Sequence, residues 1–146
     1  MEATEFISIN SLEEMHRYAR SFGALLPAKA VVAFFGDLGV GKTTFIRGLT
    51  EGISGIDSRE VSSPTFGFLH IYQGAKTVFH FDLYRLPSEK EFLLSGFDEY
   101  LDSDGICCIE WAEKIPTLLP KDCLQVHIQH RDELTRLVTI KRRADL

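Results

Sequence analysis

The sequence predicts one α/β domain over residues 1–146, a three-layer sandwich in which helices pack on both sides of a mixed parallel and antiparallel sheet. Three observations predict it. A short apolar strand leads directly into a glycine-rich loop and a helix, two further apolar runs have the length of buried strands, and two pairs of alternating segments are joined by short turns. Hairpins are antiparallel, whereas strands buried on both faces are typical of parallel pairing, so the sheet contains both.

The elements follow in chain order. A short alternating strand is expected over residues 5–9, and a helix begins at the capping box Ser11–Glu14 and runs to about Leu26. The apolar stripe of this helix, which we interpret as core, consists of Leu12, Met15, Ala19, Phe22 and Leu26. The remaining elements are a strand at 30–35, a helix from residue 44, a hairpin of 68–71 and 77–81, a short helix at 89–94, a turn at 97–101, a strand at 105–110 and a hairpin of 123–129 and 136–141.

The glycine-rich loop fits the spacing G-x-x-x-x-G-K-[ST] and stands between a strand and a helix, as a phosphate-binding loop requires. A triphosphate is wrapped by backbone N–H groups, and residues without side chains let those groups approach closely. The Lys42 ammonium would reach the β and γ oxygens, and the Thr43 hydroxyl would ligate Mg²⁺. The residues predicted to bind ATP here are Gly36, Asp37, Leu38, Gly39, Val40, Gly41, Lys42, Thr43 and Thr44. The fold is therefore expected to be of the P-loop NTPase type.

Magnesium needs a further oxygen ligand, which usually comes from an acidic residue at the end of a second buried strand. Glu110 ends the apolar run 105–110, and Asp82 ends the run 78–82. We expect Glu110 to be the main metal carboxylate, and Asp82 to complete the metal shell or orient the attacking water. With Lys42 they form the expected catalytic set. The alternative is that either acid is a solvated strand end, and we interpret His80, on the same strand face as Asp82, as structural.

Three other segments are candidate contacts. Ser63, Pro64 and Thr65 form a polar loop segment whose hydroxyls could report the γ-phosphate as a switch, or the segment could be a turn fixed by its proline. Arg85 is a candidate for charge stabilisation or partner contact, and Trp111 could cover the nucleotide or a partner groove, or lie at the edge of the core. The segment 8–11, with Asn10 and Ser11, is expected to hold the adenine.

Composition favours a compact cytoplasmic enzyme. The chain has 16 Lys and Arg against 21 Asp and Glu, a net charge of −5, which argues against tight RNA binding by the chain alone. The three cysteines lack C-x-x-C spacing, so reduced thiols are expected rather than a zinc site or a disulfide framework. The N-terminus lacks a basic segment followed by an apolar stretch, and no run has the length of a membrane span.

The motifs and their order resemble those of the TsaE family of bacterial ATPases, over most of the chain from about residue 8. The motifs that carry the resemblance are the loop at 36–43, Ser63-Pro64-Thr65-Phe66, His80-Phe81-Asp82-Leu83-Tyr84-Arg85 and Ile109-Glu110-Trp111. The resemblance implies a role in forming N6-threonylcarbamoyladenosine at position 37 of tRNAs that read codons beginning with A. It also implies that TsaB and TsaD are partners, that TsaD performs the transfer, that ATP hydrolysis resets the complex, and that tRNA is met only through the complex.

Two other functions use the same loop. A small P-loop kinase would need an arginine-bearing lid between the two acidic strands, which the sequence does not show. A nucleotide-gated interaction module would bind ATP with little hydrolysis. Weak hydrolysis by the isolated chain is expected, because no arginine finger is evident and such a group contributes ~10³ to 10⁵ in rate.

Overall fold

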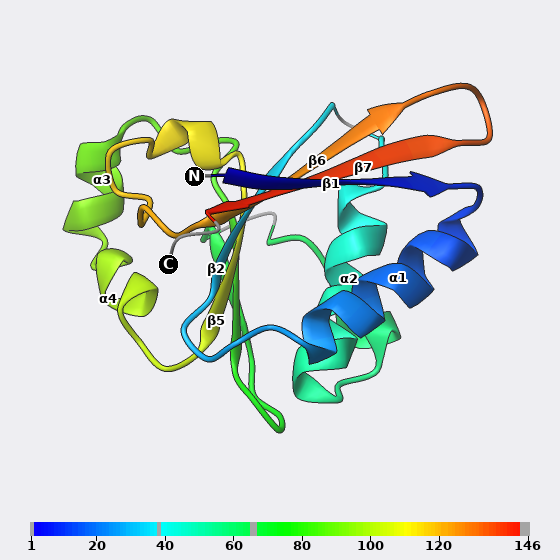
Figure 1. The fold of residues 1–146 in the computed structure, drawn as a ribbon. Helices are drawn as coiled ribbons and strands as arrows, with labels where there is room; N and C mark the ends of the chain where they lie inside the picture. The colour runs from blue at the N-terminus through cyan, green and yellow to red at the C-terminus, as the bar shows by residue number, and fades with distance from the viewer. Residues whose placement is uncertain (1, 38, 65–66, 144–146) are drawn as a thin grey trace.

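The computed structural model describes residues 2–37, 39–64 and 67–143 (Figure 1). The helices are α1 (Leu12–Ala24), α2 (Lys42–Ser54), α3 (Glu89–Leu94) and α4 (Asp98–Leu101), with two 3₁₀ turns at Ser58–Glu60 and Ala112–Lys114. The strands are β1 (Glu2–Ile9), β2 (Val31–Phe35), β3 (Leu69–Tyr72), β4 (Val78–Asp82), β5 (Ile106–Glu110), β6 (Leu124–His130) and β7 (Arg136–Arg143). The expected turn at 97–101 contains the short helix α4, and the first strand is longer than the alternation at 5–9 predicts.

The seven strands form one mixed sheet in the order β1-β7-β6-β2-β5-β4-β3. The central strand β2 pairs in parallel with β5 and β6, and β4 pairs in parallel with β5. The pairs β1 with β7, β6 with β7, and β3 with β4 are antiparallel. The predicted mixed sheet is therefore confirmed, with parallel pairing on both sides of the strand that precedes the glycine-rich loop.

Helices lie on both sides of the sheet, as expected of a three-layer sandwich (Figure 1). Side chains of α1 and α2 pack in one apolar cluster with alternate residues of β2 and β5, such as Phe34 and Cys108. The other cluster contains the opposite faces of the same strands together with Phe92 of α3 and Phe97. Because β2 and β5 are buried on both faces, their sequences are continuous apolar runs rather than alternating ones.

The α1 and α2 helices approach each other closely, which fixes the start of α2. A Cβ added at Gly23, Gly48 or Gly52 would collide with backbone atoms of the facing helix. Ser11 caps α1, since its hydroxyl accepts a hydrogen bond from the Glu14 N–H at 3.0 Å. Contact at backbone distance needs residues without side chains, so these glycines set the helix separation.

One residue of the predicted α1 stripe departs from the core. Met15 and Ala19 are fully buried, whereas Leu12 is 57% exposed. The first turn of a helix lies at the edge of its packing surface, so periodicity continues there after burial has ended. The interpretation of Leu12 as a core residue was wrong.

The three cysteines are buried and form no disulfide in the described part of the chain, as expected. Burial raises the pKa of Cys107 and of Cys123 to about 12. No helix in the described residues combines the length and hydropathy needed to cross a lipid bilayer.

Candidate phosphate-binding site

The glycine-rich loop leaves the carboxyl end of β2 and leads into α2. Gly41, the residue before α2, has a φ of 112° and no side chain in the described residues caps the helix. The N–H groups of the first turn therefore keep their capacity to donate, and the positive end of the helix dipole faces the same side. Together these features favour an anion at the start of α2.

Lys42 is the first residue of α2 and is 5% exposed. Its ammonium lies over the Trp111 ring, 4.7 Å from the centroid. Trp111 has a φ of 60° and its ring also packs against Tyr84, with 4.9 Å between centroids. The indole face stabilises the ammonium by a cation–π interaction, so Trp111 is part of the lysine's environment rather than only a residue at the core edge.

The glycine-rich loop and Glu110, one of the two predicted acids, line the same pocket of about 230 Å³. Its lining consists of Leu12, Gly39, Gly41, Lys42, Thr43, Thr44 and Glu110. Glu110 ends β5, the parallel neighbour of β2, so its position follows from the sheet. Leu12 is the lining residue that the sequence analysis missed; its only signal was its place beside the segment expected to hold adenine.

The two acids are adjacent in the sheet register but differ in environment. Asp82 of β4 is aligned with Glu110 of β5. Glu110 is buried and its Oε2 lies 2.9 Å from His80 Nε2. Asp82 is half-buried, and its Oδ1 accepts a hydrogen bond from the Tyr84 N–H at 3.1 Å. Burial raises the pKa of Asp82, and the nearby Glu110 raises it further, whereas that hydrogen bond and the nearby His80 and Lys42 lower it.

Asp82 lines a second pocket, of about 190 Å³, together with residues of the expected switch segment and Arg85. The lining is Ser63, Pro64, Phe68, Asp82, Tyr84 and Arg85. The base of the switch segment is held by Arg47 of α2, whose Nε donates to the Val61 carbonyl at 3.0 Å. The structure thus brings Ser63, Pro64 and Arg85 beside Asp82, and ties this segment to the helix that follows the loop.

The remaining predicted residues are placed as follows. Asn10 and Ser11 are exposed at the start of α1, beside the pocket residue Leu12, and their role toward adenine stays a prediction. Gly36, Asp37 and Val40 line another pocket, of about 540 Å³, between the loop and the end of β6, where His127 stacks on Phe35 at 4.7 Å. Leu38 and Thr65 lie outside the described residues.

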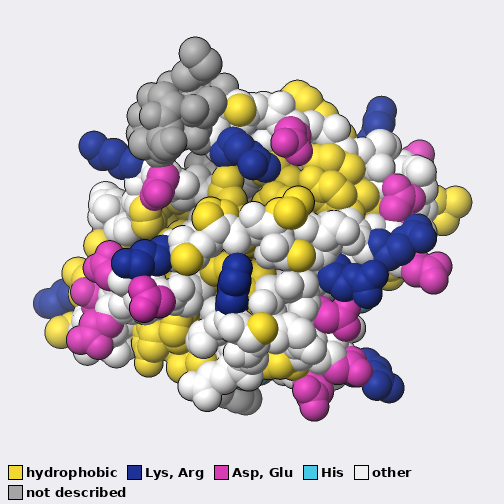
Figure 2. Space-filling model, turned by 60° about the horizontal axis from the view of Figure 1, so that its bottom comes forward, with side chains coloured by type: hydrophobic (Ala, Val, Ile, Leu, Met, Phe, Trp, Pro, Cys, Tyr) yellow, Lys and Arg dark blue, Asp and Glu magenta, His cyan; other side chains and the backbone are white. Residues whose placement is uncertain are grey.

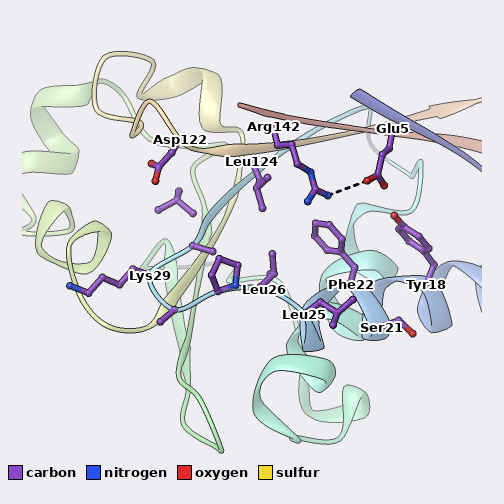
Figure 3. A pocket seen from close by; sticks show the side chains of 14 residues that line it. Glu5, Tyr18, Ser21, Phe22, Leu25, Leu26, Lys29, Asp122, Leu124 and Arg142 are labelled. Atoms are coloured by element: carbon purple, nitrogen blue, oxygen red, sulfur yellow. Dashed lines mark ion pairs between the residues drawn. The ribbon is translucent and has the colours of Figure 1, made fainter. Parts of the chain in front are cut away.

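Another hollow of about 540 Å³ lies at the opposite end of β2 from the loop (Figure 3). Phe22, Leu26 and Leu124 point into it, and the Glu5–Arg142 ion pair, at 3.6 Å, borders it. On the face that Figure 2 turns forward, basic side chains are dispersed among acidic ones. None of the residues that line this hollow is a predicted site residue, and the face in Figure 2 shows no continuous basic surface, which is typical of RNA-binding proteins, among the described residues.

Comparisons with known proteins agree in one family. The family model described as "Threonylcarbamoyl adenosine biosynthesis protein TsaE" matches residues 9–138. The tRNA threonylcarbamoyladenosine biosynthesis protein TsaE of Bacillus subtilis (strain 168) is 40% identical over 128 residues, which cover 87% of this chain and 78% of that protein. Its counterpart in Treponema pallidum (strain Nichols) is 35% identical over 130 residues, 89% of this chain and 95% of that protein. A crystal structure of Bacillus subtilis YdiB superimposes with a TM-score of 0.82 at 30% identity, covering 99% of this chain and 89% of that one.

Proposed function

This chain belongs to the TsaE family of threonylcarbamoyladenosine biosynthesis proteins, and on that premise we propose that it is the ATPase of this pathway. It binds and hydrolyses ATP with Mg²⁺, acts in complex with TsaB and TsaD, and leaves the transfer of the threonylcarbamoyl group to TsaD. The modified base is adenosine 37 of tRNAs that read codons beginning with A. The observation that supports the ATPase proposal best is the convergence of Lys42, Thr43 and Glu110 in one pocket at the start of α2.

The oxygen atoms at this pocket fit magnesium. Mg²⁺ is usually held by one or two carboxylates together with substrate phosphates and water, not by a cage of protein ligands. The pocket offers the Thr43 hydroxyl and the Glu110 carboxylate, with Asp82 on the neighbouring strand. No group of three His, Cys, Asp or Glu side chains among the described residues could hold a metal, which suits a site completed by phosphates. Bound there, the ion would neutralise charge on the β- and γ-phosphates.

The remaining steps, phosphate binding and orientation of the water, are assigned to residues of the chain itself. Lys42 carries its positive charge to the phosphate oxygens, and the amides at the start of α2 hold the anion. Asp82, which is half-buried and lines a pocket with Ser63, would orient a water toward the γ-phosphate. None of the described residues that line the pocket of Lys42 is an arginine, and Arg85 lies in the neighbouring pocket. We therefore expect weak hydrolysis by the chain alone and stimulation by its partners.

The geometry argues against a kinase. The segment between β4 and β5 carries α3 and α4, and Phe92 of α3 is fully buried against the sheet. Phe92 anchors this segment to the sheet, whereas an arginine-bearing lid must move to close over a second substrate.

The test is ATP hydrolysis by the purified chain, alone and with TsaB and TsaD, with Lys42→Ala as the control. We expect low phosphate release alone, a marked increase with both partners, and loss of the increase in Lys42→Ala. In a reconstituted system that contains the tRNA and the precursor, Lys42→Ala and Glu110→Ala should abolish sustained modification. If ATP binds but the partners change nothing and both variants sustain modification, the hydrolytic role is wrong.

A further inference from the structure

A buried hydrogen bond links the middle of β4 to the acid in the phosphate pocket. His80 Nε2 lies 2.9 Å from Glu110 Oε2, and the two side chains are only 1% and 6% exposed. The residues are 30 positions apart and come from adjacent parallel strands. His80 is two residues from Asp82, on the strand face that Val78 also shares.

The surroundings of His80 determine which ring nitrogen carries the proton. Its Nδ1 is buried and has no hydrogen-bond partner in the described part of the chain. A buried N–H without an acceptor is rarer in proteins than a buried acceptor without a donor. The proton therefore belongs on Nε2, where a carboxylate oxygen accepts it, and Nδ1 carries the free lone pair.

This bond fixes the orientation of the Glu110 carboxylate. Oε2 is held from behind by His80, whereas Oε1 has no hydrogen-bond partner among the described residues and Glu110 lines the pocket with Thr43. A carboxylate with one oxygen held inside the protein presents the other in a fixed direction. Hydrogen-bond partners behind a ligating group typically contribute 10- to 100-fold to metal affinity or activity.

A purely structural role explains His80 poorly. Two neighbours of His80 on this face are buried and apolar, Val78 on β4 and the aligned Cys108 on β5, whereas His70 is aligned with it on β3. A buried polar ring with one unpaired nitrogen is less favourable than an apolar side chain of similar size, unless its other nitrogen makes a bond that matters elsewhere.

We propose that His80 is a positioning residue, which donates from Nε2 to Glu110 and so holds the free carboxylate oxygen toward the metal and phosphates beside Thr43. The proposal rests on the proposed ATPase function and deepens it. It gives His80 a role at Glu110, whereas its place on the strand face of Asp82 alone indicates a structural residue.

The test compares three variants. His80→Leu removes the donor and keeps apolar volume, and His80→Gln keeps an N–H near the position of Nε2. Val78→Ala is the matched control, because it perturbs the same buried face of β4 without touching Glu110. Urea unfolding of each variant measures how far the fold is weakened. The binding readout is the fluorescence of mant-ATP, titrated with protein in EDTA and then with Mg²⁺, and the second readout is kcat and KM for ATP with TsaB and TsaD present.

For His80→Leu we expect mant-ATP affinity in EDTA to stay at the wild-type value, because the loop and α2 are unchanged. The Mg²⁺ concentration that gives half of the mant-ATP fluorescence change should rise about 10- to 100-fold, and kcat should fall with little change in KM. His80→Gln should restore most of the Mg²⁺ affinity and of kcat. Val78→Ala should leave the Mg²⁺ dependence and kcat unchanged, even where its urea midpoint is lower.

Two results would overturn the role of His80. One is a His80→Leu protein with the wild-type Mg²⁺ dependence. The other is a loss in Val78→Ala that matches the loss in His80→Leu at equal stability, with no rescue by glutamine. A wild-type chain that binds no mant-ATP, or binds it without regard to Mg²⁺, refutes the proposed function itself and the role of His80 with it.

Discussion

Two glycines of the glycine-rich loop, Gly36 and Gly39, allow a matched test of how backbone conformation and packing against β6 each contribute to the stability of the loop. Gly36 has a φ of 151°, and a Cβ there would lie 2.6 Å from the Ile128 carbonyl oxygen and 3.0 Å from Val40 Cγ1. Gly39 has a φ of 78°, and a Cβ there would meet no atom of the described residues within 4 Å. Alanine at Gly39 therefore tests backbone strain alone, whereas alanine at Gly36 adds a collision with β6.

The structure sets the expected magnitudes. At Gly39 a left-handed alanine costs about 1–2 kcal/mol, and the lower entropy of the unfolded chain offsets about 0.4–1 kcal/mol, so the net loss is about 1 kcal/mol or less. At Gly36 the backbone strain of an alanine costs about 1–3 kcal/mol. Overpacking adds about 1–3 kcal/mol, because Ile128 is buried in β6 and cannot move freely, so the net loss of stability is about 3 kcal/mol.

Urea unfolding followed by circular dichroism measures the difference. With a slope of about 2 kcal/mol/M, Gly36→Ala should lower the midpoint by about 1.5 M and Gly39→Ala by about 0.5 M or less. Gly39→Ala should remain folded and bind ATP more weakly, since Gly39 lines the pocket of Lys42. Equal midpoints for the two variants would refute the argument that β6 closes the space behind the loop.

Four further outcomes are expected at the site, in the core and in the turn between β6 and β7. ATP should change the emission of Trp111, the one tryptophan of the chain, because the Lys42 ammonium leaves the indole face for the phosphates; a change that persists in Lys42→Ala would contradict this. Burial raises the pKa of Asp82, so its charge opposes folding at neutral pH. Asp82→Asn should therefore raise Tm at pH 7, and this gain should be lost as pH falls through the raised pKa toward the usual value of 3.8. Hydrogen bonds lower the pKa of Asp132, so Asp132→Asn should lower Tm at pH 7, and this effect should vanish at acid pH. Differential scanning fluorimetry across pH measures the Tm of the Asp82 and Asp132 variants. Tm shifts of the same sign in the two variants at pH 7 would be inconsistent with the structure. Thiol alkylation at pH 8 should be slow in the folded chain and fast in urea, because burial holds the Cys107 pKa at about 12; fast labelling of the native protein would show that this strand is accessible.

Much of the fold and part of the site could be predicted from the sequence because their determinants are local. The loop residues 36–44 are contiguous, and the glycines, lysine and threonine needed around a triphosphate occupy fixed spacings. The apolar run ending at Glu110 predicted a central parallel strand, and the position of this acid in the loop pocket follows from the pairing of β2 with β5. Two hairpins predicted the antiparallel part of the sheet.

Other features depend on segments that are distant in the chain. Periodicity placed Leu12 in the core, but Leu12 begins α1 at the edge of the surface that packs on α2, and it is exposed. The pairing of β1 with β7 at the edge of the sheet has no local signal, because either strand could pair elsewhere with the same alternation. The stacking of His127 on Phe35 beside the loop likewise arises from the pairing of β6 with β2.

By itself the sequence determined which residues are candidates for phosphate chemistry, which strands are buried on both faces, and the family to which the chain belongs. Only the tertiary structure decided that Trp111 holds the Lys42 ammonium and that His80 holds Glu110. The physical reason is that spacing and hydropathy act within one segment, whereas a cation–π contact or a buried hydrogen bond requires two segments to be brought together at a defined register. That register is set by the packing of the whole sheet against its helices.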